Sequence, residues 1–158
     1  MEYTDDYIYS KDIDWFCIVN GYFVHVASAG GMIPPEINDD EKLKSLQKKV
    51  FDAPEFLTDE EIVINHRFLE HKFSNLPDKK IAIENYLSSF KVFAKKGFIS
   101  LDRTDIANQE SNIYHIVCMP KNLILVEDTD GYTKYKTFTA NLLTTKMDDI
   151  RLLEELQK

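Results

Sequence analysis

Cysteines and long apolar runs are scarce in this chain of 158 residues. Its two cysteines, Cys17 and Cys118, are too few for a disulfide framework, and each lies in an apolar segment where we expect a buried core residue. No segment approaches the roughly 20 apolar residues of a membrane-spanning helix. The start, from Met1 to Asp6, lacks the basic and apolar regions of a secretory signal. These absences predict a cytoplasmic protein that does not bind membranes.

Basic residues are especially scarce near the N-terminus. The first 40 residues contain one basic residue, Lys11, and eight acidic residues, which gives this segment a net charge of −7 out of −8 for the whole chain. Phosphate recognition requires clustered lysine and arginine, so we expect no nucleic-acid binding. A basic protein partner fits better, and Asp5, Asp6 and Asp12 are the candidate contact residues. The alternative is that these acidic residues only keep the chain soluble.

The composition is that of a globular domain, with 44% hydrophobic and 29% charged residues. A chain of this length forms one ordinary domain, which buries roughly 70% of the surface that the unfolded chain exposes. We therefore predict a single domain over residues 1–158. Residues 1–12 are expected to form an acidic arm of this domain that can be flexible.

The most informative pattern is Asn20-Gly21 between two segments rich in β-branched and aromatic residues. Asn-Gly favours the type I′ turn of a two-residue β-hairpin, and this turn pairs Val19 with Tyr22 and, counting outward, Asp14 with Ala27. One face of the hairpin then carries Trp15, Cys17, Val19, Tyr22, Val24 and Val26, and the other carries Asp14, Phe16, Ile18, Phe23, His25 and Ala27. Both faces are mostly apolar, so helices, a second sheet layer or another chain must cover each of them.

Helical spacing dominates the middle of the chain. Asn38 begins a capping pattern for a helix that ends near Asp52. Residues 62–73 are ambiguous, because their apolar spacing suits a helix while their first residues equally suit a strand, and we favour the helix. The clearest helix follows the N-cap Asp78 and ends at Gly97, which can take the left-handed conformation of a helix terminus.

From Phe98 onward the pattern changes to that of strands. We expect strands at 98–103, 112–119, 123–127 and 132–139, and a final amphipathic helix from about Met147. Since hairpin connections dominate this arrangement, we predict a single-domain α+β fold with a mostly antiparallel β-sheet of about six strands. The predicted order is ββ-αα(α)-ββββ-α, with three to four helices packed on the sheet.

One pair of side chains in the hairpin is suited to acid–base chemistry. Asp14 and His25 lie on the same face at a diagonal cross-strand offset, with about 7 to 8 Å between their α-carbons. A carboxylate that orients an imidazole is a common way to build a general base. No nucleophile completes the set, because Cys17 faces the other side and Ser28 lies beyond the strand end. Asp14 and His25 are therefore candidate catalytic residues, and the missing nucleophile favours the alternative of a histidine bonded within the sheet.

Three other motifs lack parts of the sites that they resemble. His66 and His71 are five residues apart, which places them about 140° apart around a helix, whereas a zinc-binding pair shares one face. Residues 128–131 lack the third ligand of an EF-hand calcium loop. Gly30-Gly31 lacks the other residues of a phosphate-binding loop and is better explained as turning the chain out of the hairpin. We therefore predict no metal site and no cofactor.

Two functions remain open. The first, which we favour, is a non-enzymatic protein-binding or regulatory module that acts through its acidic N-terminal region and first hairpin. Its partner would be a basic protein or a second copy of the chain. The second is a small hydrolase or small-molecule-binding enzyme with a pocket over the face of Asp14, Phe16 and His25. The second requires a partly exposed His25, so a face fully packed beneath a helix would eliminate it.

Overall fold

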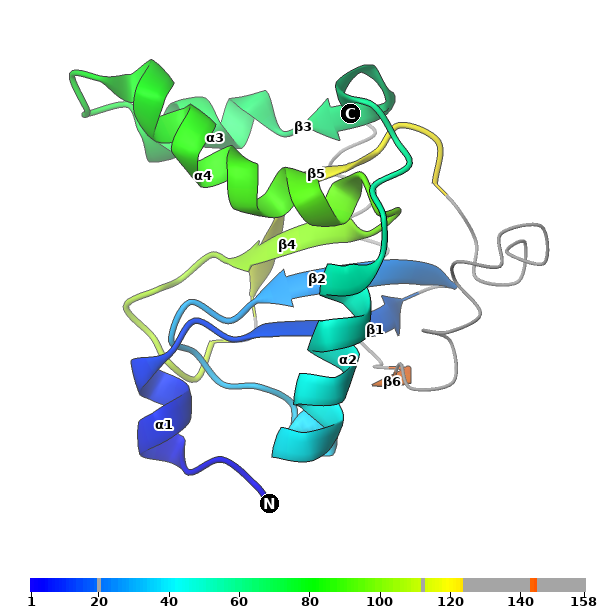
Figure 1. Cartoon of the computed structure of the whole chain (residues 1–158). Coiled ribbons are helices and arrows are strands. Elements are labelled where there is room, and N and C mark those ends of the chain that lie inside the picture. Colours follow the sequence, from blue (N-terminus) through cyan, green and yellow to red (C-terminus); the bar gives the residue numbers. More distant parts are fainter. Residues whose placement is uncertain (20, 112, 124–142, 145–158) are drawn as a thin grey trace.

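The computed structural model describes residues 1–19, 21–111, 113–123 and 143–144, and it shows an α+β fold (Figure 1). The α-helices in these residues are α1 (Asp5–Ser10), α2 (Asp40–Asp52), α3 (His66–Lys72) and α4 (Lys79–Ala94). The strands are β1 (Asp14–Val19), β2 (Tyr22–Ala27), β3 (Ile62–Ile64), β4 (Ile99–Arg103), β5 (Tyr114–Pro120) and the two-residue β6 (Leu143–Thr144). Two short 3-10 helices, η1 (Pro35–Ile37) and η2 (Asp59–Glu61), lie between them. The predicted α+β class is confirmed.

The first hairpin has the register that its turn predicts. All six pairs between β1 and β2 are present, from Val19 opposite Tyr22 to Asp14 opposite Ala27. Gly21 has a φ of 82°, in the left-handed region that a type I′ turn requires. The hairpin therefore fixes which side chains share a face of the sheet, and both of its faces are covered as expected.

The sheet is mixed, with the strand order β3-β5-β4-β2-β1-β6. Three neighbouring pairs are antiparallel, whereas β2 pairs with β4, and β1 with β6, in parallel. The predicted mostly antiparallel sheet is thus confirmed only in part, and the parallel pair at the centre of the sheet is a correction. Its cause is the long connection from β2 to β4 through α2, α3 and α4, since a crossover of this kind brings the next strand back in the same direction.

Residues 62–73 do not form the single helix that we favoured. Ile62–Ile64 form strand β3, which pairs with β5, and the helix α3 starts only at His66. Asn65 separates the two elements, because its side-chain oxygen caps α3 by accepting from the N–H of Phe68, while its amide donates to the carbonyl of Ile116. The strand alternative is correct for the first part of the segment, and the helix for the second.

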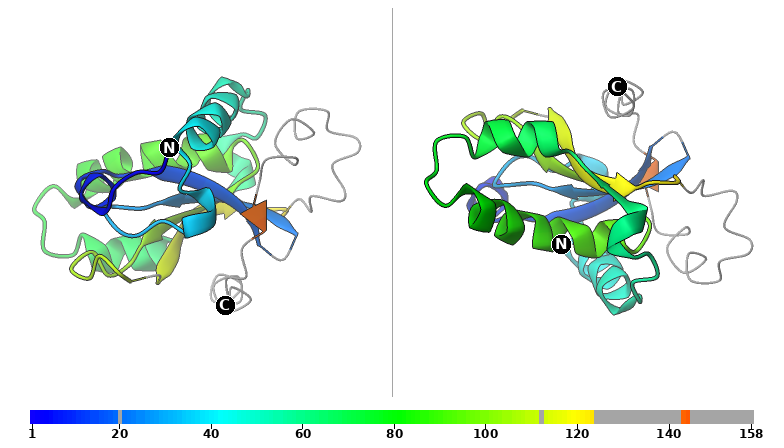
Figure 2. Two further views of the ribbon diagram at one scale, coloured as in Figure 1. Left: turned by 90° about the horizontal axis from the view of Figure 1, so that it is seen from below. Right: turned by 90° about the horizontal axis from the view of Figure 1, so that it is seen from above.

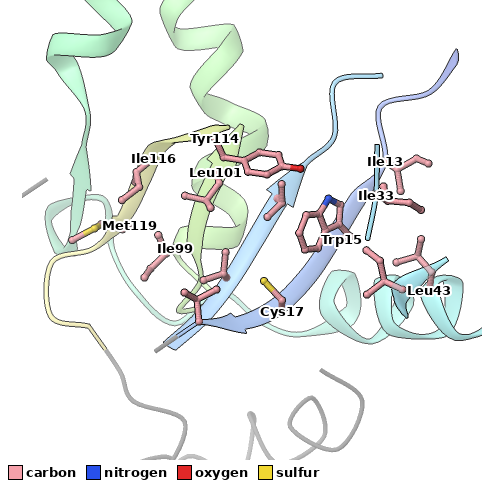
Figure 3. Close-up of a cluster of buried hydrophobic side chains, with 14 of the residues drawn as sticks. Ile13, Trp15, Cys17, Ile33, Leu43, Ile99, Leu101, Tyr114, Ile116 and Met119 are labelled. Atoms are coloured by element: carbon pink, nitrogen blue, oxygen red, sulfur yellow. The ribbon is translucent and has the colours of Figure 1, made fainter. Parts of the chain in front are cut away.

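Each face of the sheet has its own hydrophobic core. On one face, Phe16 and Phe23 of the hairpin pack with Leu46 and Val50 of α2 and with Phe93 of α4, and both helices lie along this side (Figure 2). On the opposite face, a second cluster contains Trp15, Cys17, Leu101 and Tyr114 from the strands, together with Ile33 from the loop after β2 and Leu43 from the first turn of α2 (Figure 3). Cys17 and Cys118 are both buried, as predicted.

The N-terminal segment contains structure of its own. Residues 5–10 form α1, whose Ile8 is buried in the core, and Tyr3 stacks on Tyr7 with 4.6 Å between ring centroids. The backbone N–H of Tyr3 donates to the side-chain oxygen of Asn38 at 2.8 Å. In the structure, the predicted acidic arm thus contains a short helix, and Tyr3 before this helix is bonded to the segment that leads into α2.

Several predicted elements fall outside the described residues. These are the strands at 123–127 and 132–139, apart from Leu123, and the helix from about Met147. Of the helices that the structure does describe, none has the length and apolar character needed to cross a membrane.

Candidate functional site

Asp14 and His25 meet as the hairpin register predicted. Nε2 of His25 lies 2.7 Å from Oδ1 of Asp14, which is a hydrogen bond between the start of β1 and the middle of β2. The side chain of Asp14 is about one third exposed, at 34%, whereas His25 is buried. The pair is thus a contact between a carboxylate at the surface and an imidazole inside the sheet.

Ser100 extends this pair into a series of three groups, which sequence reasoning missed. Its Oγ lies 2.6 Å from Nδ1 of His25. Ser100 is opposite His25 in the parallel pair of β2 and β4, so the pairing that brings it there could not be seen from a hairpin-based topology. With its hydrogen on Nε2, the imidazole donates to Asp14 and accepts from the hydroxyl of Ser100. We call this the Asp-His-Ser series.

The Asp-His-Ser series is sealed from solvent at two of its three groups. His25 is 1% exposed and Ser100 is 0% exposed. The ring of Phe93, from α4, stacks on the His25 ring with a centroid distance of 3.7 Å, and Phe16 packs at 5.5 Å from the same ring. A substrate cannot reach the Ser100 hydroxyl in this arrangement. The partly exposed histidine required by the enzyme hypothesis is therefore not what the structure shows.

A second polar cluster lies between α4 and the strands β4 and β5. The hydroxyl of Tyr86 donates to Oδ2 of Asp102 and lies 3.4 Å from Nε2 of His115. The hydroxyl of Thr104 lies 3.0 Å from Nδ1 of the same histidine. Asp102 and His115 are directly opposite each other in the antiparallel pair of β4 and β5. Sequence reasoning missed this cluster, because no spacing along the chain links residues from these separate elements.

Burial governs the electrostatics of this second cluster. It raises the pKa of Asp102 and also that of Tyr86. Burial, together with the positive charge of Lys72, lowers the pKa of His115 to about 3. His115 is therefore a neutral ring at physiological pH, and Phe68 of α3 stacks on it with 3.6 Å between centroids. The cluster joins the α3–α4 side of the molecule to the sheet through neutral hydrogen-bonding groups and one buried carboxylate.

Arg103 at the end of β4 organises the neighbouring loops. Its guanidinium is buried and donates to backbone carbonyls on two loops. The acceptors are Ser28 and Ala29 after β2, at 2.8 Å each, and Asp105, Ile106 and Asn108 after β4. Gly31 packs directly against this side chain, which explains the glycine at that position. The predicted role of Gly30-Gly31, turning the chain out of the hairpin, is supported by the φ of 72° at Gly30.

The three acidic candidates differ in their surroundings. Asp5 and Asp6 are exposed in the first turn of α1, and no cationic side chain of the described residues pairs with them. Asp12 has a structural contact, since its Oδ1 accepts from the N–H of Ala29 at 2.8 Å. Asp5 and Asp6 are therefore available to a partner, whereas Asp12 also holds the loop that follows β2.

Metal ligands do not gather in the described part of the chain, where no three His, Cys, Asp or Glu side chains come together as a site. Comparisons of the sequence with protein-family models and curated proteins, and of the structure with solved structures, found no match.

Proposed function

We propose that this protein is a non-enzymatic protein-binding module that acts through its acidic N-terminal region and the adjoining hairpin on a basic protein surface. One contrast carries the proposal. The imidazole of His25 and the hydroxyl of Ser100 are buried, with Phe93 of α4 stacked on the imidazole, whereas the carboxylates of Asp5 and Asp6 are exposed and lack a cationic neighbour among the described residues. The groups that can contact another molecule are thus these negatively charged carboxylates.

The exposed carboxylates are held in position by the fold. The buried Ile8 and the contact of Tyr3 with Asn38 fix α1 against the body of the protein. Charges on an ordered surface steer a complementary partner and set its orientation more effectively than charges on a free tail, because less conformational freedom is lost on binding. A basic partner would also relieve the repulsion among the acidic residues of the first 40 positions.

The hydrolase alternative receives no support from the geometry. It needs an open pocket over Asp14, Phe16 and His25, and the ring of Phe93 occupies the space next to the imidazole. The Asp-His-Ser series is better explained as a satisfied polar network inside the sheet, where each buried group has a partner.

Charge reversal tests the proposal. The Asp5→Lys/Asp6→Lys variant should recover less of any partner captured from the native lysate, with a loss that shrinks as salt is raised, since salt screens exposed charges. Its melting temperature should fall by only about 2 to 6 °C, because both side chains are exposed and the change costs mainly their interaction with the helix dipole in the first turn of α1. Asp12→Asn is the appropriate change at residue 12, since it removes the charge and keeps an oxygen acceptor for Ala29.

Glu84→Lys on the exposed face of α4 is the matched control, and it should leave capture unchanged. Recovery of the same partners, in the same amounts, with and without the Asp5 and Asp6 reversals would refute the proposal. Size-exclusion chromatography with light scattering identifies the case in which the partner is a second copy of the chain.

A further inference from the structure

Resting on the proposed protein-binding function, we propose that the partner binds at one end of the sheet, on a surface formed by residues 28–33 and 104–111 with Ile113. We call this the loop surface. We further propose that its partner is a basic protein segment that carries apolar side chains. Three observations on the described residues lead to this inference: the loops are rigidly joined, they expose apolar side chains, and acidic residues outnumber basic ones around them.

Arg103 joins the two loops into one unit. Its guanidinium donates to carbonyls of Ser28 and Ala29 on one loop and of Asp105, Ile106 and Asn108 on the other. A backbone hydrogen bond of 2.9 Å from the N–H of Met32 to the carbonyl of Gln109 adds a direct link. The loop surface is therefore ordered before a partner arrives, which lowers the conformational entropy that binding would remove.

Apolar side chains concentrate at this end of the molecule. Met32, Ile106 and Ile113 are exposed, and so is Tyr7 on the adjacent helix α1. These four are half of the eight large hydrophobic residues that are exposed in the described part of the chain. Scattered single hydrophobic residues are normal on a surface, but their concentration on two joined loops and the next helix is typical of a protein contact.

Acidic residues outnumber basic residues in the segments that form this end. No lysine or arginine occurs between Lys11 and Lys42, or between Arg103 and Lys121, and Arg103 itself is buried. The second loop carries Asp105 and Glu110, Asp12 is bonded to Ala29 of the first loop, and Asp5 and Asp6 lie on the adjacent helix α1. The exposed basic residues near this end are Lys11 in its own segments and Lys72 of α3, whose charge acts on His115, and the five acidic residues outnumber them.

This charge pattern selects the partner. Nucleic acid and anionic membranes are repelled by it, and a second copy of the chain would bring the same negative surface. A simple cation would match the charge but would leave the apolar side chains without a contact. A segment with lysine or arginine beside leucine-like side chains complements both properties.

Binding to defined peptides tests the inference on the full chain. The probes are a short lysine–leucine peptide, a lysine–serine peptide and a glutamate–leucine peptide of the same length, each added to isotopically labelled protein and followed by amide NMR shifts. We expect the lysine–leucine peptide to shift the amides of Met32, Ile106 and Gln109, with weaker effects from lysine–serine and none from glutamate–leucine. Absence of shifts with the lysine–leucine peptide, or shifts that lie outside the loop surface, would overturn the inference.

Matched variants test whether peptide binding requires the loop surface or another exposed part of the molecule. Asp105→Lys/Ile106→Ser changes one acid and one isoleucine that is 61% exposed, and Ile81→Ser/Glu84→Lys makes the equivalent changes on α4, where Ile81 is 60% exposed. The loop variant should bind the lysine–leucine peptide about tenfold more weakly, and the α4 variant within about twofold of the native chain. Similar spectra and melting temperatures of both variants establish that each is folded.

The same variants distinguish this inference from the proposed function. If a captured partner is lost on reversal of Asp5 and Asp6 but retained by the loop variant, the protein-binding function stands and the loop surface is wrong. If the lysine–leucine peptide binds at the loop surface while reversal of Asp5 and Asp6 leaves every captured partner in place, the proposed role of the N-terminal acids is wrong and the loop surface stands.

Discussion

Gly31 lies so close to Arg103 that a side chain at residue 31 would occupy the position of the arginine. A Cβ built on Gly31 would be 2.2 Å from Nε of Arg103 and 2.4 Å from its Cδ. The arginine cannot move aside freely, because five backbone carbonyls on two loops hold its guanidinium. The absence of a side chain at one position thus allows a charged side chain to be buried at the other.

Gly31→Ala should therefore destabilise the protein through Arg103. We expect a loss of about 2 to 4 kcal/mol in the free energy of unfolding, since the displaced guanidinium leaves buried carbonyls without donors. Urea denaturation of Gly31→Ala, Arg103→Lys and the double variant gives a double-mutant cycle. The two losses should be strongly non-additive, and simple addition of the two would show that Gly31 acts independently of Arg103.

His25→Ala should destabilise the core without revealing an enzyme. The change removes the ring that stacks on Phe93 and leaves the hydroxyl of Ser100 without its partner, so we expect a loss of roughly 3 kcal/mol. Ser100→Ala should cost about 1 kcal/mol, and the exposed Ser88→Ala less than about 0.5 kcal/mol. Chemical denaturation measures all three, and equal stability of His25→Ala and the native chain would contradict a structural role for the Asp-His-Ser series.

Lowering the pH should destabilise the folded protein, because His115 takes up a proton when the chain unfolds. Burial lowers the pKa of this imidazole to about 3 in the folded protein from its ordinary value of 6.5. Between these two values the unfolded chain binds a proton that the folded protein excludes, so stability is lost as the pH falls through this window. His115→Gln should show a smaller loss of melting temperature between pH 7 and pH 4 than the native protein, and the exposed His66→Gln serves as control. An imidazole NMR signal of His115 that titrates near 6.5 would exclude this mechanism.

Tyr86→Phe should lower the free energy of unfolding more at neutral pH than at acidic pH. Burial raises the pKa of Asp102, which means that ionisation of this carboxyl group destabilises the folded protein. The hydrogen bond from the Tyr86 hydroxyl stabilises the carboxylate and offsets part of this destabilisation. For a raised carboxyl pKa, stability is lost as the pH rises from the unfolded value of 3.8 through the higher folded value. Without Tyr86 this loss grows, so we expect a destabilisation of about 1 to 3 kcal/mol at pH 7 that is smaller below pH 3.8.

Denaturation curves at the two pH values measure this difference, and repeating them with His115→Gln present in both proteins removes the contribution of His115, which lies next to the Tyr86 hydroxyl. Tyr22→Phe is the matched tyrosine control, since no hydrogen bond of its hydroxyl is seen in the described residues. A Tyr86→Phe effect that is the same at both pH values would mean that the hydroxyl does not act on the charge of Asp102.

Local sequence patterns predicted the parts of the fold that depend on local geometry. Asn20-Gly21 specified the register of β1 and β2, and with it the contact of Asp14 with His25, because a two-residue turn leaves no choice of pairing. The parallel pair of β2 and β4 had no such signal, since its connection passes through three helices. Ser100 was missed for that reason. A lone hydroxyl among the apolar residues at 98–101 was the available clue.

The second polar cluster and the loop surface were beyond sequence reasoning for a related reason. Asp102 faces His115 only once the register of β4 and β5 is known, and that pair lacks a short turn to fix it. Arg103 gave no sign of its role, because its acceptors are backbone carbonyls, which every residue carries whatever its side chain. Residues 62–64 were assigned to a helix because three residues are too few to show an alternating pattern.

The hydrogen bond between His25 and Ser100 joins positions 75 residues apart in the chain. Closing a flexible loop of that length costs about 4 kcal/mol in chain entropy, whereas the hairpin beside it closes over a two-residue turn. The hairpin can therefore assemble early, while the middle of the sheet has to wait until α2, α3 and α4 have brought β4 back beside β2, a topology associated with slow folding. A single cut in the peptide chain between those helices would convert this intramolecular step into a meeting of two fragments, and refolding would then depend on concentration.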